Sequence, residues 1–200
     1  MKRTGIRKVD AEWSALPRLP RAAYQLKITL REIDPPVWRR VVVSGDLRLG
    51  KLHRIIQTVM GWEDSHLHRF EVGRNRYAPP ELEDPEAKDE SSVRLQDVAP
   101  KVGASFDYLY DMGDSWRHEI FVEKIERSPK GQKLPLCLDG ARACPPEDVG
   151  GIGGYEDLVK AMKGPDSDER KEFVQWLGRE YDSEAFSVNQ VNEILGMRRG

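Results

Sequence analysis

Two aspartates and one histidine lie close together in the segment DMGDSWRH, as Asp111, Asp114 and His118. Carboxylate and imidazole groups at this spacing could bind a divalent metal or place a general base. Aspartate is also common in turns, where it accepts hydrogen bonds from backbone N–H groups. His118 shares an apolar face with Trp116, so a buried core histidine is the alternative. We predict a candidate site at Asp111, Asp114, Trp116 and His118 and leave its chemistry open.

A second segment, CLDGARACPPEDVGGIGGY, contains two thiols, Cys137 and Cys144. Zinc sites usually have four ligands and paired cysteine or histidine spacing, which this segment lacks. The two thiols could complete a metal site only if the fold brought His66 or His118 to them. A divalent metal is the only cofactor that we consider, and no cofactor is established by the sequence. The candidate metal ligands are Asp111, Asp114, His118, Cys137 and Cys144.

The same segment also carries Glu147 and Asp148, followed by a Gly-Gly-x-Gly-Gly run. These two carboxylates join the candidate site if their loop lies against the DMGDSWRH turn. The glycine run precedes a predicted helix, and its N–H groups could bind an anion. It matches neither the phosphate-binding nor the dinucleotide-binding glycine motif. A tight loop near the core is the alternative, and we favour it.

Three further histidines could also bind a metal. His66 and His68 alternate on a predicted strand, so both rings point to one side, and His53 lies on a predicted helix. Phe70 and Val72 share the face of the histidine pair, which favours structural packing instead.

The front of the chain is basic. Residues 1–76 carry 16 Lys and Arg against 8 Asp and Glu, whereas residues 139–184 carry 6 against 12. Five basic residues cluster near Trp38 and could contact phosphates of a nucleic acid, although a solvated surface is the alternative. They are Arg39, Arg40, Arg48, Lys51 and Arg54.

Hydrophobic periodicity predicts the elements that must position these groups. Strands, a helix and another strand form a β-β-α-β start, an alternating hairpin follows, and helices close the chain. We therefore predict an α+β fold in which helices pack on a mixed, mostly antiparallel sheet. The predicted strands are 24–31, 37–43, 66–72, 105–110 and 115–125, the predicted helices are 49–60, 155–162, 167–179 and 188–195, and 78–92 and 127–154 are predicted loops.

The 200-residue length suits one domain of this size. Residues 1–22 lack periodicity and are predicted to form an extended or disordered arm, and residues 23–197 a single domain. No apolar run could span a bilayer, so we expect no membrane association. With two cysteines and no export signal, we expect reduced thiols and a cytoplasmic protein.

Five segments in this order resemble the plasmid pRiA ORF-three-like family, also found as passengers of insertion elements. They are IDPPVWRRVVV, LGKLHRIIQTVMGW, HLHRFEVGRNRY, FDYLYDMGDSWRHEI and CLDGARACPPEDVGGIGGYEDL. The resemblance covers about residues 22–196 and implies a single α+β domain from a prokaryotic, mobile-element setting. It implies no catalytic residues. Where family members carry a further cysteine, this chain has Val149, which weakens a thiolate metal site.

Two hypotheses follow for function. The first is a non-enzymatic binding or accessory module whose partner is a protein or a nucleic acid, because no nucleophile–base set is visible. The second is a metal-dependent hydrolase or nuclease that uses the carboxylate and histidine residues. Whether the protein is an enzyme stays undecided, with the first hypothesis favoured. Both depend on the two acidic segments meeting in space.

Overall fold

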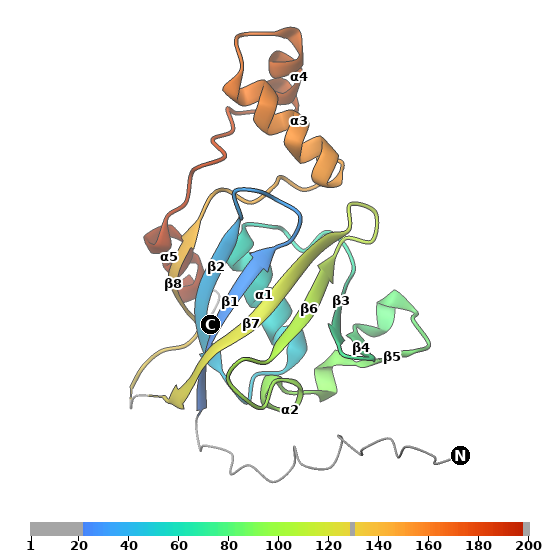
Figure 1. Cartoon of the computed structure of the whole chain (residues 1–200), viewed down its shortest axis with the longest axis vertical. Coiled ribbons are helices and arrows are strands. Elements are labelled where there is room, and N and C mark those ends of the chain that lie inside the picture. The colour runs from blue at the N-terminus through green and yellow to red at the C-terminus, as the bar shows by residue number, and fades with distance from the viewer. Residues whose placement is uncertain (1–21, 129–130, 198–200) are drawn as a thin grey trace, which may run out of the picture.

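Eight strands form one mixed sheet in the computed structural model, which describes residues 22–128 and 131–197 (Figure 1). The strand order is β5-β4-β3-β6-β7-β1-β2-β8, and all neighbours are antiparallel except β4 and β5. The α+β class with a mostly antiparallel sheet is therefore confirmed. The predicted N-terminal arm lies outside the described residues except for Ala22, where β1 begins.

The strands are β1 (Ala22–Leu30), β2 (Trp38–Ser44), β3 (His68–Val72), β4 (Asn75–Ala78), β5 (Ala87–Asp89), β6 (Ser105–Tyr110), β7 (Trp116–Arg127) and β8 (Leu136–Ala141). The helices are α1 (Leu49–Met60), α2 (Leu95–Val98), α3 (Gly151–Lys163), α4 (Asp168–Leu177) and α5 (Val188–Met197), with short 3-10 helices η2 (Pro80–Leu82) and η3 (Glu90–Ser92).

Strand β1 lies near the middle of the sheet, between β7 and β2. Its alternating apolar residues Leu26, Ile28 and Leu30 are buried. Leu26 pairs with Val41 of β2 and with Val122 of β7, which are also buried. One face of the three central strands therefore forms the core, as the period-2 pattern predicts.

Helix α1 crosses one face of this sheet (Figure 1). Its apolar positions Leu49, Leu52, Ile56 and Val59 are all buried. The helix ends at Gly61, whose φ of 93° lies in the left-handed region that glycine adopts readily. The observed bounds agree with the predicted helix 49–60, because a continuous apolar stripe and a glycine stop coincide here.

Several elements were not predicted from the sequence. The predicted loop 78–92 contains β5 and two 3-10 helices, and β8 lies within the predicted irregular region 127–154. Both strands lie at the edges of the sheet. Their sequences, AKD and LCLDGA, are short and carry no clear period-2 alternation of apolar residues. Helix α3 begins at Gly151, so the glycine run forms its first turn and does not precede it.

The C-terminal helices occupy two places. Helices α3 and α4 project beyond the end of the sheet, whereas α5 returns to β8 and α1 (Figure 1). At β8 the side-chain amide of Asn192 accepts a hydrogen bond from Cys137 N at 2.8 Å and donates one to Cys137 O at 2.9 Å. Within the described residues, no helix is both long and apolar enough to cross a membrane.

Candidate functional site

The turn between β6 and β7 contacts the loop that precedes α3. The backbone N–H of Gly150 donates a hydrogen bond to Oδ2 of Asp114 over 3.2 Å. The hydroxyl of Tyr110, at the end of β6, donates one to Oε1 of Glu147 over 2.8 Å. The two acidic segments on which both functional hypotheses depend are therefore adjacent.

His66 lies between two of the predicted aspartates. Its Nε2 atom is 2.9 Å from Oδ1 of Asp148 and 3.7 Å from Oδ2 of Asp111. This nitrogen is buried and makes no hydrogen bond of acceptable geometry with the described residues. We call these three residues the His66 cluster. Their ligand atoms lie within 4.8 Å of one another, so they could hold a cation, or form ion pairs when His66 is protonated.

Both aspartates of the His66 cluster have left-handed backbone conformations, with φ of 57° for Asp111 and 59° for Asp148. Such values are uncommon for residues other than glycine, although aspartate tolerates them better than most. Oδ1 of Asp111 accepts a hydrogen bond from the N–H of Gly113 over 2.8 Å, which fixes the carboxylate in its turn. Asp111 is only 7% exposed. The local turn chemistry thus aims one buried carboxylate at His66.

The structure places the other two residues of the hairpin in the core. Trp116 and His118 are buried, and the ring of His118 lies edge-on to that of Trp62. Nδ1 of His118 is 3.1 Å from the carbonyl oxygen of Trp116. The two groups of possible metal ligands found in residues 22–128 and 131–197 include neither His118 nor Asp114. The structure therefore separates His118 from Asp111 and Asp148.

The buried ring of His118 makes stability depend on pH. Burial lowers the pKa of His118 from 6.5 to about 4, so below pH 6.5 the unfolded chain binds a proton that the folded chain does not. The free energy of unfolding should therefore fall as pH drops from 6.5 towards 4, by about 2 kcal/mol between pH 7 and pH 5 from this group. Urea denaturation at both pH values measures the change. His118→Gln should remove this part of the pH dependence of the free energy of unfolding. If the variant depended on pH as steeply as the wild type, His118 would not be its source.

The two cysteines lie apart from the possible metal ligands. Both are free thiols, and burial raises the pKa of each, that of Cys144 to about 12. A thiol must lose its proton to bind zinc, so these surroundings oppose thiolate ligation. Neither cysteine joins a group of three ligand-type side chains in the described part of the chain.

The five basic residues do not share one surface. Arg39 is 2% exposed, and its guanidinium donates hydrogen bonds to backbone carbonyls, including that of Val59 over 2.7 Å. Arg40 is paired with Glu123 at 2.7 Å. The other three, Arg48, Lys51 and Arg54, are exposed at and after the start of α1 and line a pocket.

This pocket has a volume of about 600 Å³ and lies beside the segment that joins α1 to β3. His53 of α1, Asp64 of the joining segment and His68 of β3 all line it. One ligand atom from each of the three lies within 4.8 Å of the others. We call them the His53–Asp64–His68 triad. Its imidazole rings are stacked, with centroids 3.4 Å apart and planes 1° from parallel.

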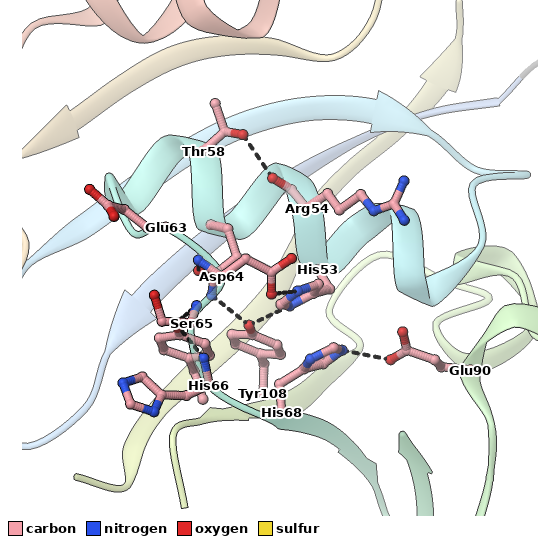
Figure 2. A network of polar contacts seen from close by, with 12 residues as sticks. His53, Arg54, Thr58, Glu63, Asp64, Ser65, His66, His68, Glu90 and Tyr108 are labelled. Carbon is pink, nitrogen blue, oxygen red and sulfur yellow. Dashed lines mark hydrogen bonds and ion pairs between the residues drawn. The ribbon is translucent and has the colours of Figure 1, made fainter. Parts of the chain in front are cut away.

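Each imidazole of the triad is held by a further side chain (Figure 2). Nδ1 of His53 lies 2.7 Å from the hydroxyl of Tyr108, and Nε2 lies 2.6 Å from Oδ1 of Asp64. Nε2 of His68 lies 2.8 Å from Oε2 of the buried Glu90. Metal-binding histidines usually bond a carboxylate or another oxygen through the nitrogen that does not bind the metal. Here Tyr108 and Glu90 occupy that role, which leaves Nε2 of His53 and Nδ1 of His68 for a cation.

The surroundings also keep one of these ligands neutral. Burial and the neighbouring His68 lower the pKa of His53 to about 4, although Asp64 acts in the opposite direction. A neutral imidazole can bind a metal without first losing a proton. Gly50 makes room for this arrangement, because a Cβ atom there would lie 2.8 Å from Oε1 of Glu90.

The sequence indicated this triad only in part. The spacing of His66 and His68 suggested two imidazoles on one side, but in the structure they belong to different clusters. Asp64, Glu90 and Tyr108 carried no signal, because their roles arise from contacts between residues far apart in the chain. Glu90 lay in the segment that was predicted to be a loop.

Comparisons with known proteins agree with this fold. A search of curated proteins finds uncharacterized protein y4hQ of Sinorhizobium fredii (strain NBRC 101917 / NGR234), which is 40% identical over 176 residues, covering 86% of this chain and 89% of the relative. Among solved structures, the protein of unknown function MM3350 from Methanosarcina mazei Go1 is similar, with a TM-score of 0.78 and 33% identity. The match covers 85% of this chain and 97% of that one.

The family model described as plasmid pRiA4b ORF-3-like protein matches residues 22–190. This range contains every strand of the sheet, the triad and the His66 cluster. The chain therefore belongs to the plasmid pRiA4b ORF-3-like protein family.

Proposed function

We propose that this protein is a metal-dependent hydrolase in which the His53–Asp64–His68 triad binds one divalent transition metal. The observation that carries the proposal is that both imidazoles are fixed through their second nitrogen, by Tyr108 and by Glu90. Two histidines and one carboxylate suit zinc and related metals.

Three protein ligands leave a coordination position for water or substrate, which is the pattern of catalytic zinc sites. A bound metal there would lower the pKa of its water and so supply a nucleophile near neutral pH. The chain itself supplies the positioning. Gln57 donates a hydrogen bond to the Tyr108 hydroxyl over 3.0 Å and accepts one from the backbone N–H of Asp64 over 3.0 Å. One side chain therefore joins the support of His53 to the carboxylate ligand.

The other hypothesis, a non-enzymatic accessory module for a protein or nucleic acid, requires binding without turnover. Family membership fits either one, since it implies only a plasmid-associated protein. We place the protein in the prokaryotic cytoplasm, where its two free thiols would stay reduced.

Metal loading and turnover together test the proposal. Purified protein is dialysed against zinc, manganese or cobalt, and its metal content is measured by elemental analysis. We expect about one ion per chain, a higher melting temperature, and hydrolysis of chromogenic phosphate or carboxylic esters only by the loaded protein. Metal binding without turnover of any ester would favour the accessory module. Absence of metal binding would overturn the proposal.

A further inference from the structure

We propose that the pocket beside the triad binds a small ligand that carries a phosphate group, held by Lys51 and Arg54. The inference rests on the proposed function and names its substrate class. It begins from the basic residues of α1 that line the pocket, Arg48, Lys51 and Arg54. Residues three apart share one side of a helix, so the three cations flank a single face of the pocket.

Two of these cations are available to a ligand. The side chains of Lys51 and Arg54 are exposed and make no hydrogen bond or ion pair with the described residues. Arg48 instead donates a hydrogen bond to the carbonyl oxygen of Ser91. A fixed Arg48 beside two unpaired cations provides donors that a phosphate group can accept.

Acidic residues in the pocket offset the charge of its basic residues, so a bound metal should strengthen anion binding. Asp64, Glu81 and Glu90 also line it, so the three bases face three acids. Asp64 and Glu90 lie against His53 and His68. A divalent metal on the triad would add two positive charges and leave the pocket with a net positive charge. Phosphate binding should therefore strengthen when the metal is present.

The shape of the pocket favours a small molecule over a nucleic acid. A volume of about 600 Å³ is in the range of small-molecule sites. From Arg48 to Arg54 the helix advances only about 9 Å. The cations therefore cover one or two phosphate groups, and not an extended backbone.

Calorimetric titration tests the proposal on the cobalt-loaded and the metal-free protein. The probe is phenylphosphonate, a phosphate-ester analogue whose P–C bond the proposed hydrolase would not cleave. The double variant Lys51→Glu/Arg54→Glu changes two exposed side chains and should weaken phenylphosphonate binding at least about 10-fold. Metal content should not change. Lys124→Glu is the matched control, because Lys124 is an exposed cation on β7 outside the pocket. The affinity of this variant for phenylphosphonate should equal that of the wild type.

The outcomes separate this proposal from the proposed function. Metal bound without measurable phenylphosphonate affinity, or equal affinity in the double variant and the control, would overturn the phosphate pocket alone. Phosphate binding that needs Lys51 and Arg54 in a protein that takes up no metal would overturn the hydrolase and keep the pocket. If a single-stranded oligonucleotide displaced phenylphosphonate at far lower concentration than a small phosphate compound does, the ligand would be a nucleic acid and not a small molecule.

Discussion

Gly154→Ala is expected to lower the free energy of unfolding by about 3 kcal/mol or more. A Cβ atom at Gly154 would lie 1.8 Å from the carbonyl oxygen and 2.8 Å from the carbonyl carbon of Val149. Both are backbone atoms, so no side-chain rotation can relieve the overlap. The first turn of α3 must shift, and with it the loop that carries Glu147 and Asp148. Urea denaturation of the purified variant measures the loss.

Gly153→Ala is the matched control, one residue earlier in the same helix. Nothing lies within 4 Å of a Cβ atom at Gly153. Alanine is favoured over glycine inside a helix by about 1 kcal/mol, so this variant should be as stable as the wild type or more so. If the two variants lost stability equally, the close approach to Val149 would not be the cause.

Asp64→Asn is expected to lower the affinity for zinc or cobalt by at least about 100-fold. The substitution keeps the size of the side chain but removes the only anionic ligand of the triad. Asp64 has a φ of 63°, a conformation that asparagine also tolerates. The Asp64 side chain is about half exposed, so the fold should be retained. Competition titration with a chromogenic chelator measures the affinity, and the melting temperature of the metal-free variant monitors the fold.

Asp148→Asn distinguishes the triad from the His66 cluster. Asp148 is also an exposed aspartate beside a histidine, with a φ of 59°. The Asp148→Asn substitution should leave the affinity of the triad for zinc or cobalt unchanged. The opposite result, with affinity lost in Asp148→Asn and kept in Asp64→Asn, would move the metal to His66, Asp111 and Asp148.

The core of the fold could be predicted because local pattern and long-range packing agree there. Helix 49–60 and strand 105–110 have the predicted bounds, since their apolar residues repeat at the period of the element that forms. The edge strands β5 and β8 could not be predicted this way. Each gains its hydrogen bonds from a neighbouring strand, β4 and β2 respectively, and the choice of neighbour leaves no periodic signal.

The candidate site was predictable to a similar extent. Both functional hypotheses required the DMGDSWRH turn to approach the Pro-Pro-Glu-Asp loop, and the structure brings Asp111 and Asp148 to the same histidine. Their functional role stays a prediction. The triad was harder to foresee, because three of the side chains that build and support it, Asp64, Glu90 and Tyr108, come from separate parts of the chain.

The amide of Asn192 has a consequence for the behaviour of the protein in a crowded solution. At the β8 edge it satisfies both backbone groups of Cys137, as a further strand would. The opposite edge, β5, is only three residues long and ends in the charged pair Lys88 and Asp89. The contact of α5 with β8 and the short, charged β5 are both features that hinder strand-by-strand growth of a sheet into fibrils.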